Sequence, residues 1–181
     1  MATTGLAVMN LRLWLVRHGV TDWKDAGRFT GWTDVPLNEQ GRQQAEQLAA
    51  RLAGIEFAGI WSSDLDRAVQ TARLAVGWAV PDYRLRELNF GDLEGLAWQE
   101  CPADAQQALM EFDGFQAPGG ESVPQLRQRV LDFLAALPDG DHLLFTHGGV
   151  IRLIRREAGC DGYLPPGGLV HVPWPPSDFD P

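Results

Sequence analysis

Cysteine, positive charge and long apolar runs are all scarce in this sequence of 181 residues. Its two cysteines, Cys101 and Cys160, lack the spacing of a metal-binding or redox motif, so we expect free thiols. The chain has 15 Lys and Arg against 24 Asp and Glu, and a net charge of -9 argues against nucleic acid or an anionic membrane surface as a partner. No apolar run approaches the ~20 residues of a membrane-spanning helix, and the N-terminus lacks the basic start of a secretory signal. A cytoplasmic protein fits this composition best.

The order of apolar segments indicates the fold class. The length is typical of one domain, residues 1–181, in which residues 1–8 are expected to be a flexible extension. Apolar runs of strand length alternate with helical patterns, which is typical of βαβ units and a mostly parallel sheet covered on both faces. We therefore predict an α/β fold, a three-layer α/β/α sandwich.

Individual elements have local signals of their own. The predicted strands are apolar runs bounded by Gly, Pro or polar residues, and they cover Leu11–Val16, Gly59–Ser62, Asp82–Leu85, His142–Thr146 and Leu169–Trp174. Predicted helices follow Asn38 as a cap, Ser63 with Asp66 and Ser122 with Gln125 as capping boxes, and also cover Ala103–Phe112 and Gly149–Ala158.

Basic residues follow three of the predicted strands. Arg17 and His18 come directly after the first, Arg67 opens the helix after the second, and His147 follows the fourth. Because parallel strands place their carboxyl ends at one edge of the sheet, these side chains can converge. Arg67 opposes the dipole of its helix, so either nearby Asp residues neutralise it or it shares an anionic ligand with the helix N-terminus. Guanidinium suits phosphate and imidazole can act as a nucleophile, so a phosphate-handling site is the favoured interpretation.

Five motifs in order carry a family resemblance, and they cover nearly the whole chain from Leu11 to the final strand. They are Arg17-His18-Gly19, Gly31–Leu37, Ser62–Ala68, Glu87–Gly95 and Thr146–Gly149. Together they resemble the histidine phosphatase superfamily, which includes the phosphoglycerate mutases. The resemblance implies that His18 is the nucleophile and forms a phosphohistidine. It also implies that Arg17, Arg67 and His147 hold the phosphoryl oxygens and that Glu87 donates the proton, without a metal or another cofactor.

Further residues are assigned to phosphate or substrate binding. They are Thr21, Lys24, Thr30, Gly31 and Gly148. Lys24 stands where the family usually has asparagine, so either it supplies a replacement cation or it points to solvent and the Thr30 or Gly31 N–H compensates. Glu94 and Glu121 are the other candidate acids, whereas His142 and His171 are expected to be structural. Aromatic residues have two open interpretations, a pocket wall or core packing, and they are Trp23, Trp32, Trp98, Phe112 and Phe115.

The resemblance leaves the reaction with alternatives. The segment 96–120 is a short insertion expected to lie over the site, and mutases of this family have a longer one. This favours a phosphomonoester hydrolase, a histidine acid-type phosphatase that acts on a small phosphorylated metabolite. The chain looks most similar to the α-ribazole phosphatases of cobalamin assembly. A phosphoglycerate mutase is the alternative within enzymes, and a non-catalytic phosphate-binding or regulatory protein is the alternative of another class. The oligomeric state stays open.

Overall fold

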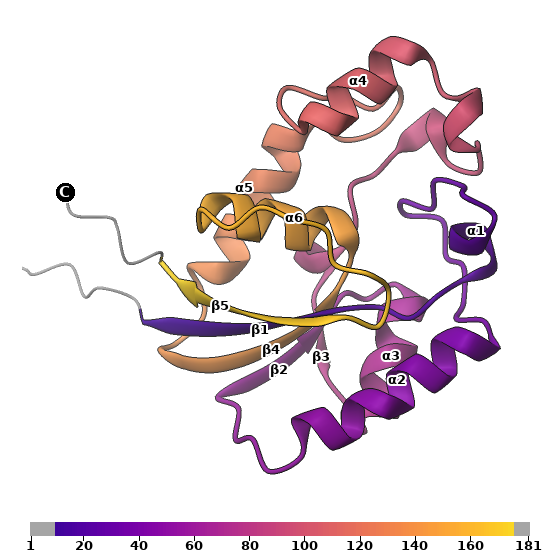
Figure 1. The fold of residues 1–181 in the computed structure, drawn as a ribbon. Coiled ribbons are helices and arrows are strands. Elements are labelled where there is room, and N and C mark those ends of the chain that lie inside the picture. Colours follow the sequence, from indigo (N-terminus) through magenta and orange to yellow (C-terminus); the bar gives the residue numbers. More distant parts are fainter. Residues whose placement is uncertain (1–9, 176–181) are drawn as a thin grey trace, which may run out of the picture.

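A computed structural model describes residues 10–175 of the chain (Figure 1). The predicted extension at residues 1–8 lies outside the described residues. The strands are β1 (Leu11–Arg17), β2 (Gly59–Ser62), β3 (Val80–Pro81), β4 (Gly140–Thr146) and β5 (Leu169–Trp174). The helices are α1 (Asp22–Asp25), α2 (Glu39–Leu52), α3 (Asp66–Val76), α4 (Ala103–Glu111), α5 (Val123–Leu134) and α6 (Gly148–Glu157). Three short 3-10 helices, η1 (Tyr83–Leu85), η2 (Gly91–Leu93) and η3 (Trp98–Glu100), lie between β3 and α4.

The five strands form one sheet in the order β3-β2-β4-β1-β5. All neighbouring pairs are parallel except β1 and β5, so the sheet is mostly parallel as predicted. Arg17 pairs with Thr146 at the carboxyl ends of β1 and β4, and Ser62 pairs with Phe145 beside them. The residues that follow these three strands are therefore delivered to one edge of the sheet.

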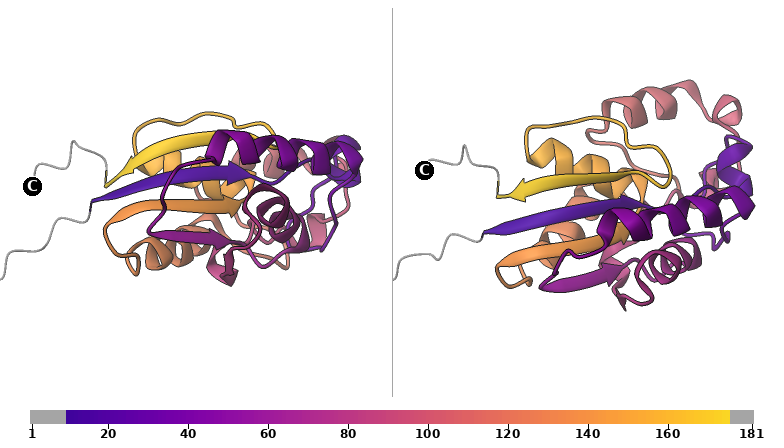
Figure 2. Two further views of the ribbon diagram at one scale, coloured as in Figure 1. Left: turned by 90° about the horizontal axis from the view of Figure 1, so that it is seen from below. Right: turned by 60° about the horizontal axis from the view of Figure 1, so that its bottom comes forward.

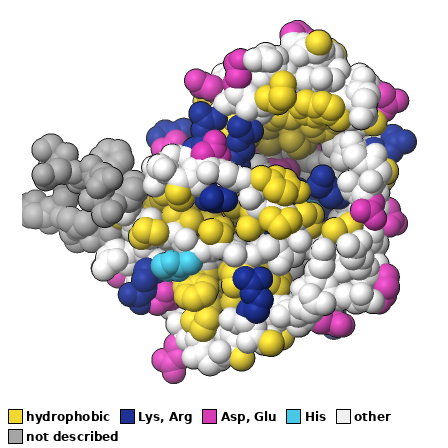
Figure 3. Space-filling view, in the orientation of Figure 1, with side chains coloured by type: hydrophobic (Ala, Val, Ile, Leu, Met, Phe, Trp, Pro, Cys, Tyr) yellow, Lys and Arg dark blue, Asp and Glu magenta, His cyan; other side chains and the backbone are white. Residues whose placement is uncertain are grey.

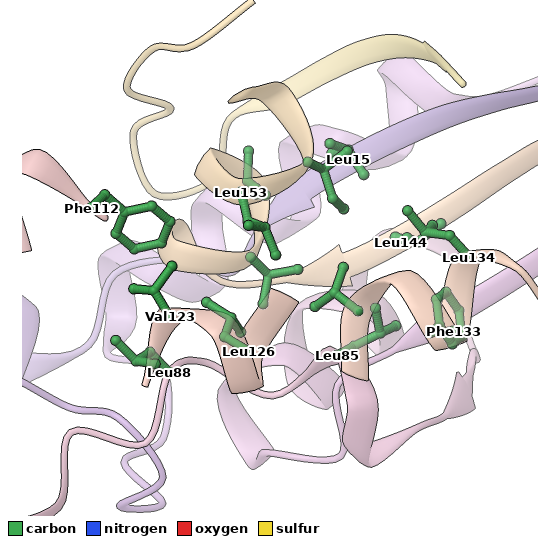
Figure 4. Packing of buried hydrophobic residues seen from close by; sticks show 14 of the residues in the cluster. Leu15, Leu85, Leu88, Phe112, Val123, Leu126, Phe133, Leu134, Leu144 and Leu153 are labelled. Carbon is green, nitrogen blue, oxygen red and sulfur yellow. The ribbon is translucent and has the colours of Figure 1, made fainter. Parts of the chain in front are cut away.

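Helices cover both faces of the sheet, and Figure 2 shows the sheet between them. The side chains of Leu13, Leu15 and Leu144 join the apolar cluster that includes residues of α5 and α6. Figure 4 shows Leu15 and Leu144 in this cluster. Val16 and Phe145 join a second cluster with residues of α2 and α3. This alternation follows from the two-residue period of a strand, which sends neighbouring side chains to opposite faces. The predicted three-layer arrangement is what the structure shows.

Two local predictions are wrong. The segment Asp82–Leu85 is not a strand, because the Asp82 side chain accepts a hydrogen bond from the Arg84 N–H at 2.9 Å and caps the 3-10 helix η1. The capping box of Ser63 and Asp66 does not form, since α3 starts at Asp66. The Ser63 hydroxyl accepts from the Leu65 N–H at 3.3 Å, and the Asp66 N–H donates to the distant Asp34 carboxylate at 2.8 Å. A tertiary contact therefore replaces the local cap.

Candidate active site

A cavity of about 840 Å³ opens where β1 and β4 end. Most of the predicted site residues line it, namely Arg17, His18, Lys24, Thr30, Gly31, Arg67, Glu87 and Gly148. His147 is fully buried directly behind this lining, and its ring centroid is 5.1 Å from that of His18. The fold thus brings together residues that come from five separate parts of the sequence.

His18 is held in the state that a nucleophilic imidazole needs. Its Nδ1 lies 2.7 Å from the carbonyl oxygen of Gly19, and because a carbonyl only accepts, this nitrogen carries the proton. The Nε2 lone pair is then free to act as an acceptor, and it receives the Arg67 Nε–H at 3.3 Å. Burial lowers the pKa of His18 well below its usual value, and the charges of Arg67 and Arg17 lower it further. The ring is therefore neutral, with Nε2 as its nucleophilic atom.

Arg67 is a buried cation that is fixed by backbone carbonyls. Its side chain is 1% exposed, and its two terminal nitrogens donate to Thr33 O at 3.1 Å and Gly31 O at 2.6 Å. Burial lowers its pKa, although guanidinium stays protonated in proteins. Neutral carbonyls orient this charge without cancelling it, so Arg67 can stabilise negative charge on a group attacked by His18.

Arg17 and His147 have buried polar atoms with no hydrogen-bond partner among the described residues. These atoms are Arg17 Nε and both ring nitrogens of His147. Burial and the charge of Arg67 lower the pKa of His147 well below its usual value. Unpaired buried polar atoms are costly, and they are retained where a ligand satisfies them. Gly148 makes room for Arg17, because a Cβ atom at this glycine would lie 3.1 Å from Arg17 Cζ.

Glu87 is the carboxylate that faces this cluster. Its two carboxylate oxygens accept the Gly149 N–H at 3.1 Å each, and Oε1 also accepts the Leu88 N–H at 2.9 Å. The other two candidate acids are structural. Glu94 accepts hydrogen bonds from the backbone of Trp32 and Thr33, and Glu121 forms an ion pair with Arg129 at 2.7 Å.

The loop between β1 and α2 places the remaining predicted residues. Thr21 is buried, does not belong to the cavity lining, and caps α1 by accepting the Lys24 N–H at 3.2 Å. Lys24 is the only lysine of the sequence, it lines the cavity, and its charge is one of those that lower the pKa of His18. Thr30 and Gly31 line the cavity, and the Gly31 carbonyl serves as a partner of Arg67.

Apolar side chains form a further part of the cavity lining. We call it the aromatic wall, and it consists of Phe29, Phe90, Trp98, Leu109 and Phe112. Hydrophobic side chains gather below α4, where the surface is hollowed (Figure 3). Phe29 contacts Phe90 and Trp98 with ring centroids 5.0 and 5.8 Å apart.

For the aromatic residues, the sequence left open whether they form a pocket wall or pack in the core, and the structure separates them into two groups. Trp98 and Phe112 belong to the wall, whereas Phe115 is a core residue and Trp23 and Trp32 are outside the lining. The indole of Trp32 donates to Glu87 O at 2.8 Å, so it supports the site from behind. His142 is buried between Trp61 and Pro138 O, as expected for a structural histidine.

Several lining residues were not predicted from the sequence. Gly149 holds Glu87 through its N–H, while Tyr163 and Leu164 come from the loop before β5. The Leu164 carbonyl accepts from Arg17 at 2.8 Å, and the Tyr163 ring lies 5.4 Å from Arg17 Cζ. Gly149 belongs to the motif Thr146–Gly149, so the sequence could have identified it as a site residue. Tyr163 and Leu164 belong to no such motif.

Residues 10–175 contain neither a metal-binding cluster nor a membrane-spanning helix. In this part of the chain, no three His, Cys, Asp or Glu side chains come together as a metal-binding group. None of the helices found there is long and apolar enough to cross a membrane.

Comparison with known proteins gives matches over most of the chain. The family model of the histidine phosphatase superfamily (branch 1) matches residues 13–162. The metal-independent phosphoserine phosphatase of Arabidopsis thaliana is 38% identical over 157 residues, which is 77% of this chain and 65% of that protein. The chain thus spans just under two thirds of the length of that relative.

Two solved structures share the fold. A phosphoglycerate mutase from Thermus thermophilus superposes with a TM-score of 0.85 at 45% identity, covering 91% of this chain and 94% of the other. A putative α-ribazole-5′-P phosphatase from Escherichia coli superposes with a TM-score of 0.78 at 28% identity, covering 92% and 91%. The expected likeness to α-ribazole phosphatases is therefore the weaker of these two matches.

Proposed function

Because the chain belongs to the histidine phosphatase superfamily (branch 1), whose members act on phosphorylated small molecules, we propose that it hydrolyses phosphomonoesters through a phosphohistidine on His18. The observation that carries this proposal is the neutral His18 ring, fixed by Gly19 O and surrounded by buried donors without partners. Such a group of donors is complementary to a phosphoryl group.

The first step is attack of His18 Nε2 on phosphorus. As the ester bond lengthens, negative charge spreads over the phosphoryl oxygens, and the guanidinium groups of Arg17 and Arg67 are placed to stabilise it. His147 supplies a ring N–H from behind the site, since both of its nitrogens lack partners in the described residues. These three side chains stabilise the transferring group with fixed protein charges and dipoles.

Glu87 completes both half-reactions. Its carboxyl group gives a proton to the departing alkoxide in the first half, and its carboxylate takes a proton from water in the second. The attack of this water on the phosphohistidine breaks the N–P bond and releases phosphate. The Gly149 and Leu88 N–H groups hold the carboxylate in the orientation that both transfers require.

Hydrolysis is favoured over mutase activity by the shape of the site. A mutase must shield its phosphohistidine from water until a second substrate returns. Here the cavity of about 840 Å³ is wide, and the short segment 96–120 contributes only Trp98, Leu109 and Phe112 to its lining. The likeness to a phosphoglycerate mutase at 45% identity makes mutase activity the second candidate.

The aromatic wall supports an ester of a planar, uncharged group as substrate. Its five side chains are apolar, and aromatic pockets bind ring systems through area burial and stacking. Among specific substrates, α-ribazole 5′-phosphate is our best choice, because it joins a phosphate to a sugar that carries an apolar ring system. The similarity to a putative α-ribazole-5′-P phosphatase points in the same direction.

A substrate panel tests this proposal. Phosphate release is measured with α-ribazole 5′-phosphate, phosphoserine, 3-phosphoglycerate and nucleoside monophosphates, without added metal and with EDTA. The expected result is hydrolysis that is strongest for α-ribazole 5′-phosphate. Isomerisation of 3-phosphoglycerate without phosphate release would establish the mutase instead. Binding of phosphate without turnover of any ester would establish the non-catalytic alternative.

A further inference from the structure

Two residues of the aromatic wall, Leu109 and Phe112, belong to α4 and its C-terminal end, and this helix packs weakly on the rest of the protein. None of the residues within α4 is fully buried, in contrast to α2, α3, α5 and α6. Ala105, Ala108 and Leu109 of α4 are only partly buried against the apolar cluster. The buried anchor is Phe112, directly after the helix, which has a left-handed backbone with φ of 52° and is 5% exposed. Figure 4 shows the Phe112 ring beside Val123 at one end of the apolar cluster.

Two arginines of α6 hold this end of α4. Arg152 donates from Nη1 to Leu109 O at 3.1 Å and from Nη2 to Met110 O at 2.6 Å. Arg156 donates to the next two carbonyls, those of Glu111 and Phe112. The last carbonyls of a helix have no partner within it, and α4 has no basic residue of its own in the last turn. The arginines therefore supply a cap from another element.

Arg152 also contacts two side chains that line the cavity, those of Phe112 and Asp161. Its Cζ lies 4.7 Å from the centroid of the Phe112 ring, a cation–π contact with the aromatic wall. Its Nε lies 3.8 Å from the carboxylate of Asp161, a residue of the loop before β5 that also lines the cavity. Although Arg152 is a cation in the lining, both of its terminal nitrogens donate to carbonyl oxygens of α4. It is therefore suited to fix the wall and not to bind phosphate.

We propose that Arg152 is a positioning residue that determines specificity for bulky leaving groups by fixing α4 and Phe112 against the cavity. This inference rests on the proposed phosphatase function. The phosphoryl group contacts His18, Arg17 and Arg67, and none of these is hydrogen-bonded to Arg152. Only the leaving group reaches the aromatic wall. Loss of Arg152 therefore changes the relative kcat/KM of esters with large and small leaving groups.

The test is the variant Arg152→Met, which keeps the length and apolar stem of the side chain and removes its donors. We compare kcat/KM for 2-naphthylmethyl phosphate and methyl phosphate, both esters of primary alcohols. A displaced wall loses roughly 60 Å² of contact with the naphthyl ring, so the ratio of the two kcat/KM values should fall about tenfold. The change should come from KM. The matched control is Arg127→Met, which removes the exposed ion pair with Glu157 and should leave the ratio unchanged.

A second measurement does not depend on turnover. Hydrogen exchange of the α4 amides, residues 103–112, should be faster in Arg152→Met than in the wild type, while exchange in α5 stays the same. Equal losses for both esters would overturn the proposal, because Arg152 would then act on the phosphoryl group. Unchanged exchange in α4 would overturn it as well. If the wild type hydrolyses no ester, the proposed function fails, and the exchange experiment still decides whether Arg152 holds α4.

Discussion

Gly149→Ala should disable the proton donor without changing any ionisable residue. Gly149 donates its N–H to both oxygens of the Glu87 carboxylate at 3.1 Å. A Cβ atom at this position would overlap Glu87 Oε1 and lie 3.3 Å from Cδ, so the carboxylate must move away. The colliding atoms end a flexible side chain, and alanine in place of glycine favours a helix by about 1 kcal/mol. Stability should therefore change by less than about 1 kcal/mol.

The kinetic effect should depend on the leaving group. General acid catalysis contributes roughly 10²–10⁴-fold, so a displaced Glu87 should lower kcat/KM for benzyl phosphate by about a hundredfold. p-Nitrophenolate leaves without a proton, so kcat/KM for p-nitrophenyl phosphate should change by less than about threefold. The assay is phosphate release from both esters, with stability followed by urea unfolding. Gly148→Ala is the comparison, because its Cβ would crowd Arg17. This variant should lower kcat/KM for both esters by the same factor. If Gly149→Ala lowers kcat/KM for both esters by the same factor, Glu87 is not the proton donor.

Three other predictions concern the site. Lys24→Ala should raise the inhibition constant of phosphate about tenfold, the loss of one charged hydrogen bond of ~1.4 kcal/mol, and phosphate should protect this only lysine from amine-directed labelling. Burial lowers the pKa values of His18 and His147 below the usual 6.5, so the unfolded chain binds more protons under acid conditions. Their contribution to the free energy of unfolding should be complete above pH 6.5 and decrease as the pH falls below it. His147→Gln should make the free energy of unfolding, measured with urea, fall less steeply with decreasing pH. An unchanged pH dependence would contradict the lowered pKa of His147. Trp98→Ala should raise KM for benzyl phosphate several-fold, whereas Trp78→Ala, at an exposed position outside the cavity, should not.

Local sequence signals correctly predicted those helices whose N-terminal caps are formed by residues within one helical turn of the capped N–H groups. Asn38 accepts the Gly41 N–H, and Ser122 and Gln125 form the expected capping box of α5. The failures occur where a neighbouring segment competes with the local signal. Asp34 caps α3 from a loop 32 residues away, a contact with no signature in the sequence around Ser63.

The phosphate side of the site was predictable from the sequence, and the leaving-group side was not. Arg17 ends β1, and Arg67 and His147 come after β2 and β4; because these strands are parallel, their carboxyl ends lie at one edge of the sheet. Arg152 and Tyr163 reach the cavity through the path of α6 and the loop after it, which depends on tertiary packing. Their sequence contexts are those of an ordinary basic helix face and an ordinary loop.

The most direct test of the account is detection of the phosphorylated residue. The enzyme is mixed with an excess of benzyl phosphate, quenched in alkali, where phosphohistidine persists, and analysed by peptide mass spectrometry. Glu87→Gln, with p-nitrophenyl phosphate as donor, should accumulate the intermediate, because its breakdown lacks the base. The account predicts one phosphoryl group on the peptide that contains His18, and none in His18→Ala, which should keep its circular dichroism spectrum. A phosphoryl group on His147, or turnover by His18→Ala at the wild-type rate, would contradict it.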